Sequence, residues 1–221
     1  MKIRPHPQPN DTPTPERQWQ WEGITVLTAR AALPPAPGQG RRARRFERCY
    51  AQLADVFFAR CEQTLLPAAV ESCRAALERS APWRRTSALL CCETFPQDGG
   101  LLSVTMTVRA GAEGSEQPMR RWADVWDTEA MLPVPLSEWF PPHTSVSRRI
   151  RACADAAAGE RKSAARRALR PQSYRLAESG LCILCRGGDE VLLPWDAERG
   201  PFPHPAARRP QKAGPPPGDP L

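Results

Sequence analysis

The amino-acid sequence predicts a single α+β domain, with a long kinked helix and a second helix packed on an antiparallel sheet. Three observations predict this class: an apolar stripe with helical spacing, a strictly alternating segment after it, and a second amphipathic helix followed by a hairpin. The 221 residues, 41% hydrophobic and 25% charged, suit one small soluble domain with loose ends.

A long helix is expected over residues 41–79. Phe46 and Tyr50 begin an apolar stripe that recurs every three or four positions along this segment. Pro67 interrupts the segment and should kink the helix near Thr64, because proline removes a backbone donor.

The clearest strand signal is the period of two over residues 102–110. Even positions are apolar and odd positions are serine, threonine or arginine, which predicts one buried face and one wet face. Further strands are expected at residues 23–33, 87–95 and 120–127, the last with Trp122 and Trp126 on one face.

The sequence pattern of the C-terminal part predicts a helix followed by a hairpin. The hairpin pairs residues 174–185 with residues 191–195. The helix begins near Ser145 and has an apolar edge of Val146, Ile150 and Cys153.

Proline is concentrated at the two ends of the chain. Five of its 26 prolines lie between Pro5 and Pro15, and eight lie between Pro201 and Pro220. Because these ends offer few apolar residues to bury, both are expected to be disordered. The predicted organisation is a disordered N-terminus (1–18), an α+β domain (19–196) and a disordered C-terminal tail (197–221).

The sequence favours a cytoplasmic protein without a membrane anchor. It has no apolar stretch near the ~18 residues that cross a bilayer, and no apolar run follows the N-terminal residues as in a signal peptide. The eight cysteines are therefore expected to be reduced thiols, with Cys49, Cys61 and Cys73 as small apolar fillers.

The residue types for catalysis or metal binding are sparse. His6 and His204 lie in the proline-rich ends, and His143 lies in a loop without a nearby cysteine or carboxylate cluster. Cys182 and Cys185 lack a second pair of zinc ligands and fall in a predicted strand, which holds them too far apart for a disulfide. We expect no catalytic residue, no metal and no cofactor.

Two alternatives rest on charged side chains. A carbohydrate hydrolase would use a pair among the acids Asp124, Asp127, Glu129 and Glu138, and its sign would be two carboxylates facing each other across a cleft. A nucleic-acid-associated protein would use the arginine-rich stretch 148–170. That stretch has no interleaved aromatic residues to stack bases, so a solvated helix surface is favoured.

Three stretches, in this order, resemble the extracytoplasmic domain of the RsiV-type anti-sigma factors, an uncharacterised-domain family. The resemblance spans about residues 24–195. Its motifs are Cys49-Tyr50-x-x-Leu53 with Leu65-Leu66-Pro67-Ala68-Ala69, Trp126-Asp127-Thr128 with Pro135-Leu136-Ser137-Glu138-Trp139-Phe140, and Tyr174-Arg175-Leu176-Ala177-Glu178-Ser179-Gly180-Leu181.

The resemblance implies an α+β fold and a non-catalytic domain that binds a protein, as the best-known member binds lysozyme. The family usually carries a Gly-Gly-Ala-His loop after its hairpin, where this chain has Ala110-Gly111-Ala112-Glu113. This departure argues against lysozyme as the partner. We therefore expect a binding module with an unidentified protein partner, with candidate contact residues Glu113, Trp122, Trp126 and Trp139.

Overall fold

A computed structural model describes residues 14–97, 100–141, 143–158, 169–185 and 190–195. Most of the two expected disordered ends lies outside these ranges. The element order is β1 (Glu16–Trp21), β2 (Ile24–Ala31), α1 (Arg41–Arg60), η1 (Cys61–Leu65), α2 (Leu66–Glu78), β3 (Thr86–Gln97), β4 (Leu101–Ala112), β5 (Gln117–Asp127), β6 (Leu132–Pro133), η2 (Leu136–Trp139), α3 (Val146–Ala158), β7 (Leu169–Ala177), β8 (Gly180–Cys185) and β9 (Glu190–Pro194).

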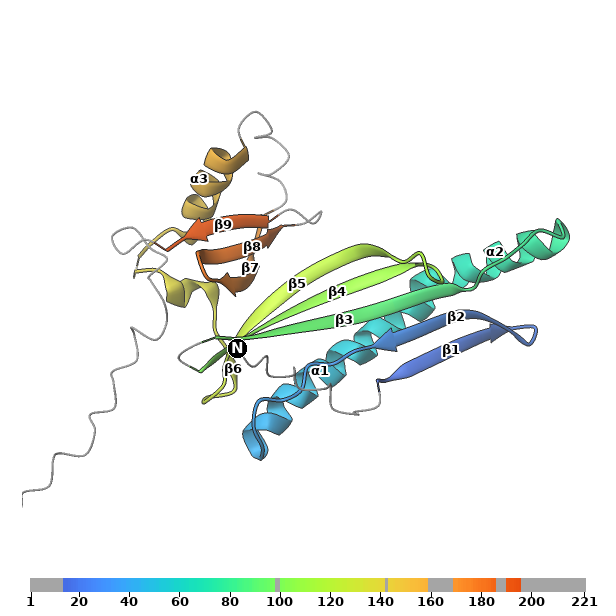
Figure 1. Cartoon of the computed structure of the whole chain (residues 1–221), viewed down its shortest axis with the longest axis horizontal. Coiled ribbons are helices and arrows are strands. Elements are labelled where there is room, and N and C mark those ends of the chain that lie inside the picture. The colour runs from blue at the N-terminus through green and yellow to red at the C-terminus, as the bar shows by residue number, and fades with distance from the viewer. Residues whose placement is uncertain (1–13, 98–99, 142, 159–168, 186–189, 196–221) are drawn as a thin grey trace, which may run out of the picture.

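The fold is α+β, as predicted, but its strands form two sheets rather than one. The large sheet has the order β1-β2-β3-β4-β5-β6 and the small sheet the order β7-β8-β9. All neighbouring strands are antiparallel except β2 and β3, which are parallel because the long helix connects them. Figure 1 shows that helix running along the large sheet, with the small sheet and α3 at one end of it.

The long helix has the kink that Pro67 predicts. Between α1 and α2 the backbone passes through a π-helical turn, Cys61–Leu65, and Pro67 lies in the first turn of α2. The hydroxyl of Thr64 donates to the carbonyl of Arg60 at 2.8 Å, so this side chain satisfies a carbonyl at the irregular turn. The predicted helix 41–79 thus forms as one kinked rod.

The N-terminal boundary differs from the prediction. Strand β1 begins at Glu16, within the segment expected to be disordered, and pairs antiparallel with β2 from Glu16↔Arg30 onward. Its alternating residues Trp19 and Trp21 pack against the core, and this contact stabilises the short strand.

The main core lies between the large sheet and the long helix. The even positions Leu102, Val104 and Met106 of β4 are buried there, as their alternation predicts. The side chains at odd positions were expected to be exposed to solvent, yet Ser103 is 0% and Thr105 1% exposed. The reason is that the small sheet covers this other face: Leu176 donates its backbone N–H to the hydroxyl of Ser103 at 3.3 Å.

The small sheet also corrects the prediction of one final hairpin. The segment expected as a single strand, residues 174–185, itself turns back at Glu178–Ser179 and gives β7 and β8. A second core forms beneath this sheet, where Ile150 of α3 is 1% exposed. Among the helices of the described residues, none is long and apolar enough to cross a membrane.

Candidate functional site

Two of the four predicted contact residues are buried. Trp126 of β5 is 4% exposed and Trp139 of η2 is 3% exposed, so neither offers a surface for a partner in this structure. Each donates its indole N–H to a tyrosine hydroxyl, Trp126 to Tyr50 at 2.9 Å and Trp139 to Tyr174 at 2.8 Å. These tryptophans are core residues, because their polar atoms find buried partners.

The other two predicted residues lie apart from each other. Trp122 is half-buried on the helix-facing side of β5, and the guanidinium of Arg120 lies 5.4 Å from its ring centroid. Glu113 is exposed just beyond β4 and pairs through two hydrogen bonds with Arg85, next to the start of β3. The structure does not bring the four predicted residues together into one surface.

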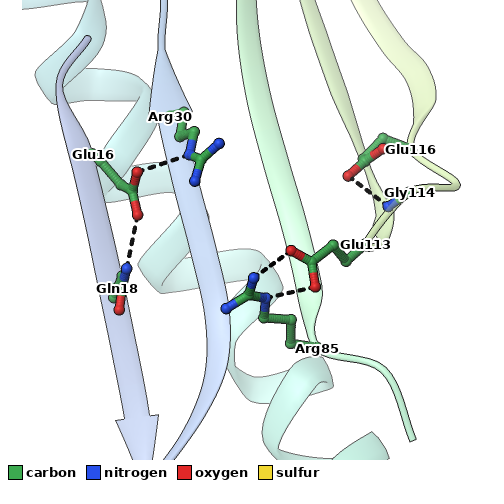
Figure 2. Close-up of polar contacts among 7 residues, drawn as sticks. All are labelled: Glu16, Gln18, Arg30, Arg85, Glu113, Gly114 and Glu116. Carbon is green, nitrogen blue, oxygen red and sulfur yellow. Dashed lines mark hydrogen bonds and ion pairs between the residues drawn. The ribbon is translucent and has the colours of Figure 1, made fainter. Parts of the chain in front are cut away.

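Glu113 belongs instead to a polar cluster at one end of the large sheet (Figure 2). Beside its pair with Arg85, Glu16 of β1 accepts hydrogen bonds of 2.7 Å from both Gln18 and Arg30. The hydrogen bonds from Arg85 hold the pKa of Glu113 below its ordinary value, and the bond from Gln18, with that from Arg30, does the same for Glu16. Since these groups are exposed and already paired, water screens them, and their role is to join strand ends.

A pocket of about 670 Å³ lies where four parts of the chain meet. Its volume falls in the range of small-ligand sites, about 300–1,000 Å³. Apolar side chains and prolines make up most of its wall. The lining residues are Asp124 and Val125 of β5, Pro133–Ser137, Val146 and Ser147 at the start of α3, and Tyr174 of β7.

Asp124 is the one carboxylate that lines this pocket among the described residues. Burial raises the pKa of its side chain, because the ionised form loses hydration. Within the described part of the chain, its carboxylate has no hydrogen-bond or ion-pair partner to offset that loss. It therefore differs from Glu16 and Glu113 in Figure 2, each of which accepts a hydrogen bond from an arginine.

Both tyrosines of the chain lie close enough to Asp124 for its charge to act on them. Burial raises the pKa of Tyr50 and of Tyr174, and the negative charge of Asp124 raises each further. Tyr174 is already committed: its hydroxyl accepts from Trp139 and donates to the carbonyl of Val134 at 2.5 Å. This geometry fixes one part of the pocket wall, whereas Asp124 is a lining carboxylate without a partner among the described residues.

The paired-acid geometry of a glycosidase is not found at this pocket. Asp127 accepts hydrogen bonds from the backbone N–H groups of Glu129 and Ala130, so it caps the turn that follows β5. Glu138 is exposed in η2 and does not line the cavity. No second carboxylate of the described residues faces Asp124 across it.

The cysteines and histidine give no further reactive cluster in the described ranges. No group of three or more histidine, cysteine, aspartate or glutamate side chains gathers as metal ligands there. Cys182 lies in β8, as predicted, and its thiol donates to the carboxylate of Glu190 at 2.9 Å. Burial raises its pKa to about 12, with the Glu190 bond adding to the effect, so the thiol stays protonated. His143 is exposed.

The arginine-rich stretch is described only in its first part. Arg148 and Arg151 are exposed on α3 and Arg149 is half-buried. Most of the remaining arginines of this stretch lie in residues 159–168, outside the described residues.

Comparisons with known proteins identify the fold. No family model matches the sequence, and no curated protein matches it. The structure is similar to that of a DUF3298 family member from Bacteroides fragilis, with a TM-score of 0.54 and 12% identity over 82% of this chain and 88% of that chain. A DUF3298 family protein from Pseudomonas aeruginosa PAO1 matches with a TM-score of 0.44 and 16% identity, over 86% and 91%.

The chain has a fold similar to that of the Bacteroides fragilis DUF3298 protein. At 12% identity this likeness concerns the backbone arrangement alone and carries no function with it. The Asp124 pocket is therefore assigned from this chain's own residues.

Proposed function

We propose that this chain is a non-catalytic binding module whose binding site is the Asp124 pocket. The observation that carries the proposal is a ligand-sized cavity whose lining residues include Asp124, a desolvated carboxyl without a partner among the described residues. A perturbed ionisable group in a pocket costs stability, so it is a candidate for function.

The chemistry around Asp124 favours binding over catalysis. A mechanism that uses one side chain as general acid and another as general base needs a second group that can exchange a proton near neutral pH. Burial raises the pKa of the Cys49 thiol and of the Tyr174 hydroxyl, and Asp124 adds to both shifts, so both stay protonated. Asp124 is left as an anchor for a ligand rather than one member of a reacting pair.

The type of partner follows from the resemblance to the RsiV-type domains, to which DUF3298 domains are related. We extend to this chain the binding of a protein partner, and not lysozyme itself. Tyr174, which stands in one of the quoted motifs, lines the pocket, and Trp139 of another quoted motif donates a hydrogen bond to its hydroxyl. This placement supports a role for those motifs in shaping the site.

The test is a fragment screen by NMR with wild-type protein and two variants. Bound fragments should shift the backbone amide signals of Asp124, Leu136 and Ser147 together. Ser147→Trp, which fills the pocket, should abolish these shifts. Ser72→Trp is the matched control, because Ser72 is an exposed helical serine on α2 that does not line the pocket.

Either of two results would overturn the proposal. Fragments that bind elsewhere, and equally well to Ser147→Trp, would show that the pocket is not the site. Turnover of a bound glycan or peptide that disappears in Asp124→Asn would show that the module is catalytic.

A further inference from the structure

We infer that the Asp124 pocket takes a primary ammonium group on an aliphatic stem, such as a lysine side chain of the partner protein. The inference rests on the proposed function and specifies its ligand. It is carried by three features of the lining: an unmatched carboxylate, the lack of basic side chains, and an apolar wall.

The pocket has an excess of negative charge when Asp124 is ionised. Its lining residues include no lysine, arginine or histidine. Asp124 also has no ion-pair or hydrogen-bond partner within the described residues. A cation that enters the pocket therefore supplies a charge-assisted hydrogen bond that the protein itself does not provide.

The wall suits an aliphatic stem rather than a polar ligand. Val125, Val134, Leu136 and Val146 contribute hydrocarbon surface, together with the ring of Pro133. Lysine places four methylene groups behind its ammonium, and such stems bury well along apolar surface while the charged head keeps a polar partner.

Two other ligand classes fit the lining less well. A sugar needs many hydrogen-bond partners, yet the lining offers few besides Asp124: the hydroxyls of Ser137 and Ser147, and that of Tyr174, which Trp139 and Val134 already use. An anionic ligand would meet the charge of Asp124. The first turn of α3 favours anions, so an acidic probe belongs in the test.

The experiment measures binding of three capped amino acids to the full chain by NMR titration. N-acetyl-lysine methylamide carries the ammonium. N-acetyl-norleucine methylamide has the same aliphatic stem without the charge, and N-acetyl-glutamate methylamide has the opposite charge. The lysine probe should bind about tenfold more tightly than the norleucine probe. Asp124→Asn should remove this difference.

The pH dependence gives a second readout that needs no variant. The lysine affinity should rise with pH as Asp124 ionises, while the norleucine affinity should stay constant. The titratable groups around Asp124 are the Cys49 thiol and the Tyr50 and Tyr174 hydroxyls, all with a raised pKa, and Glu138, which acts on Tyr174. Any pH dependence of lysine binding that remains in Asp124→Asn is the contribution of Glu138.

Each outcome decides a different claim. Equal binding of lysine and norleucine, unaffected by Asp124→Asn, would overturn the ammonium inference while the binding pocket stands. Preference for the glutamate probe would overturn it as well. If no probe shifts the pocket amides, and the fragment screen also finds no ligand there, both claims fail. Titration with 1-aminopentane separates the two sources of an ammonium: tighter binding of the capped lysine indicates a polypeptide, and equal binding a free amine.

Discussion

The indole N–H of Trp139 donates a 2.8 Å hydrogen bond to the hydroxyl of Tyr174 at the wall of the Asp124 pocket. The same relationship recurs on the helix-facing side of the large sheet, where Trp126 donates to Tyr50. Asp124 acts electrostatically on both tyrosines. Two buried tryptophan–tyrosine pairs therefore flank one carboxyl, and the first two predictions below concern this region.

Tyr174→Phe should destabilise the fold by about 1–3 kcal/mol, because it leaves the Trp139 indole N–H and the Val134 carbonyl without their partner. Urea unfolding measures this change. The same substitution in a Trp139→Phe background should cost less, since the indole donor is then already gone. Equal costs in both backgrounds would mean that the hydrogen bond contributes nothing.

Asp124→Asn should stabilise the protein at neutral pH by about 0.5–2 kcal/mol, the usual gain when a functional residue that costs stability is replaced. The pKa of Asp124 is raised in the folded state, so the native form binds its proton more tightly than the unfolded chain does. Wild-type stability therefore falls as the pH rises above 3.8, the ordinary value. Unfolding of both proteins between pH 3.5 and 8 should show that wild type loses stability relative to the variant as the pH rises.

Glu190→Gln should have the opposite pH signature. Burial raises the pKa of Glu190, but the hydrogen bonds from Cys182 and Arg175 and the charge of Arg121 together lower it below 4.5. A lowered folded-state pKa gives stability that is present above 4.5 and lost as the pH falls through the folded value. At pH 7 the variant should lose about 1–2 kcal/mol, less than a fully buried pair would.

Glu78→Gln is the control for that substitution, because Glu78 is exposed at the end of α2. It should leave thermal unfolding nearly unchanged. A loss of stability in Glu190→Gln that is the same at pH 3.5 and at pH 7 would argue against the ion network between β5, β7 and β9.

Gly180→Ala should destabilise the small sheet by about 1–3 kcal/mol, through overpacking. A Cβ at position 180 would lie 2.0 Å from the backbone carbonyl oxygen of Leu193 on β9, and backbone cannot move aside as a side chain can. Ser179→Ala, an exposed neighbour in the same turn, should have little effect in the same thermal melt. Equal melting temperatures for the two variants would contradict the close approach of β8 and β9.

Local patterns in the sequence predicted the elements that depend on nearby residues. The kink at Pro67 and the buried face of Leu102, Val104 and Met106 follow from local rules of proline and of strand alternation. The burial of Ser103 and Thr105 does not, because the small sheet that covers them comes some 70 residues later. For the same reason, local patterns did not predict that the strands divide into two sheets.

The site was predictable only in part. Asp124 was one of four candidate acids, but its place in a pocket depends on how residues 133–137 fold back beside β5 and on α3 and Tyr174, which come later in the sequence. One signal was present: Asp124 stands between Trp122 and Trp126 on the same, otherwise apolar face of its strand. A carboxylate on such a face is costly to bury, and this cost distinguishes it from acids in turns.

A ¹³C NMR titration of the Asp124 side-chain carboxyl tests the central claim most directly. The account predicts that this group titrates above its ordinary value of 3.8 in the free protein. It also predicts that its pKa falls when N-acetyl-lysine methylamide is added, because the ammonium favours the ionised form. An Asp124 that titrates at the ordinary value, with no response to this probe, would contradict the account.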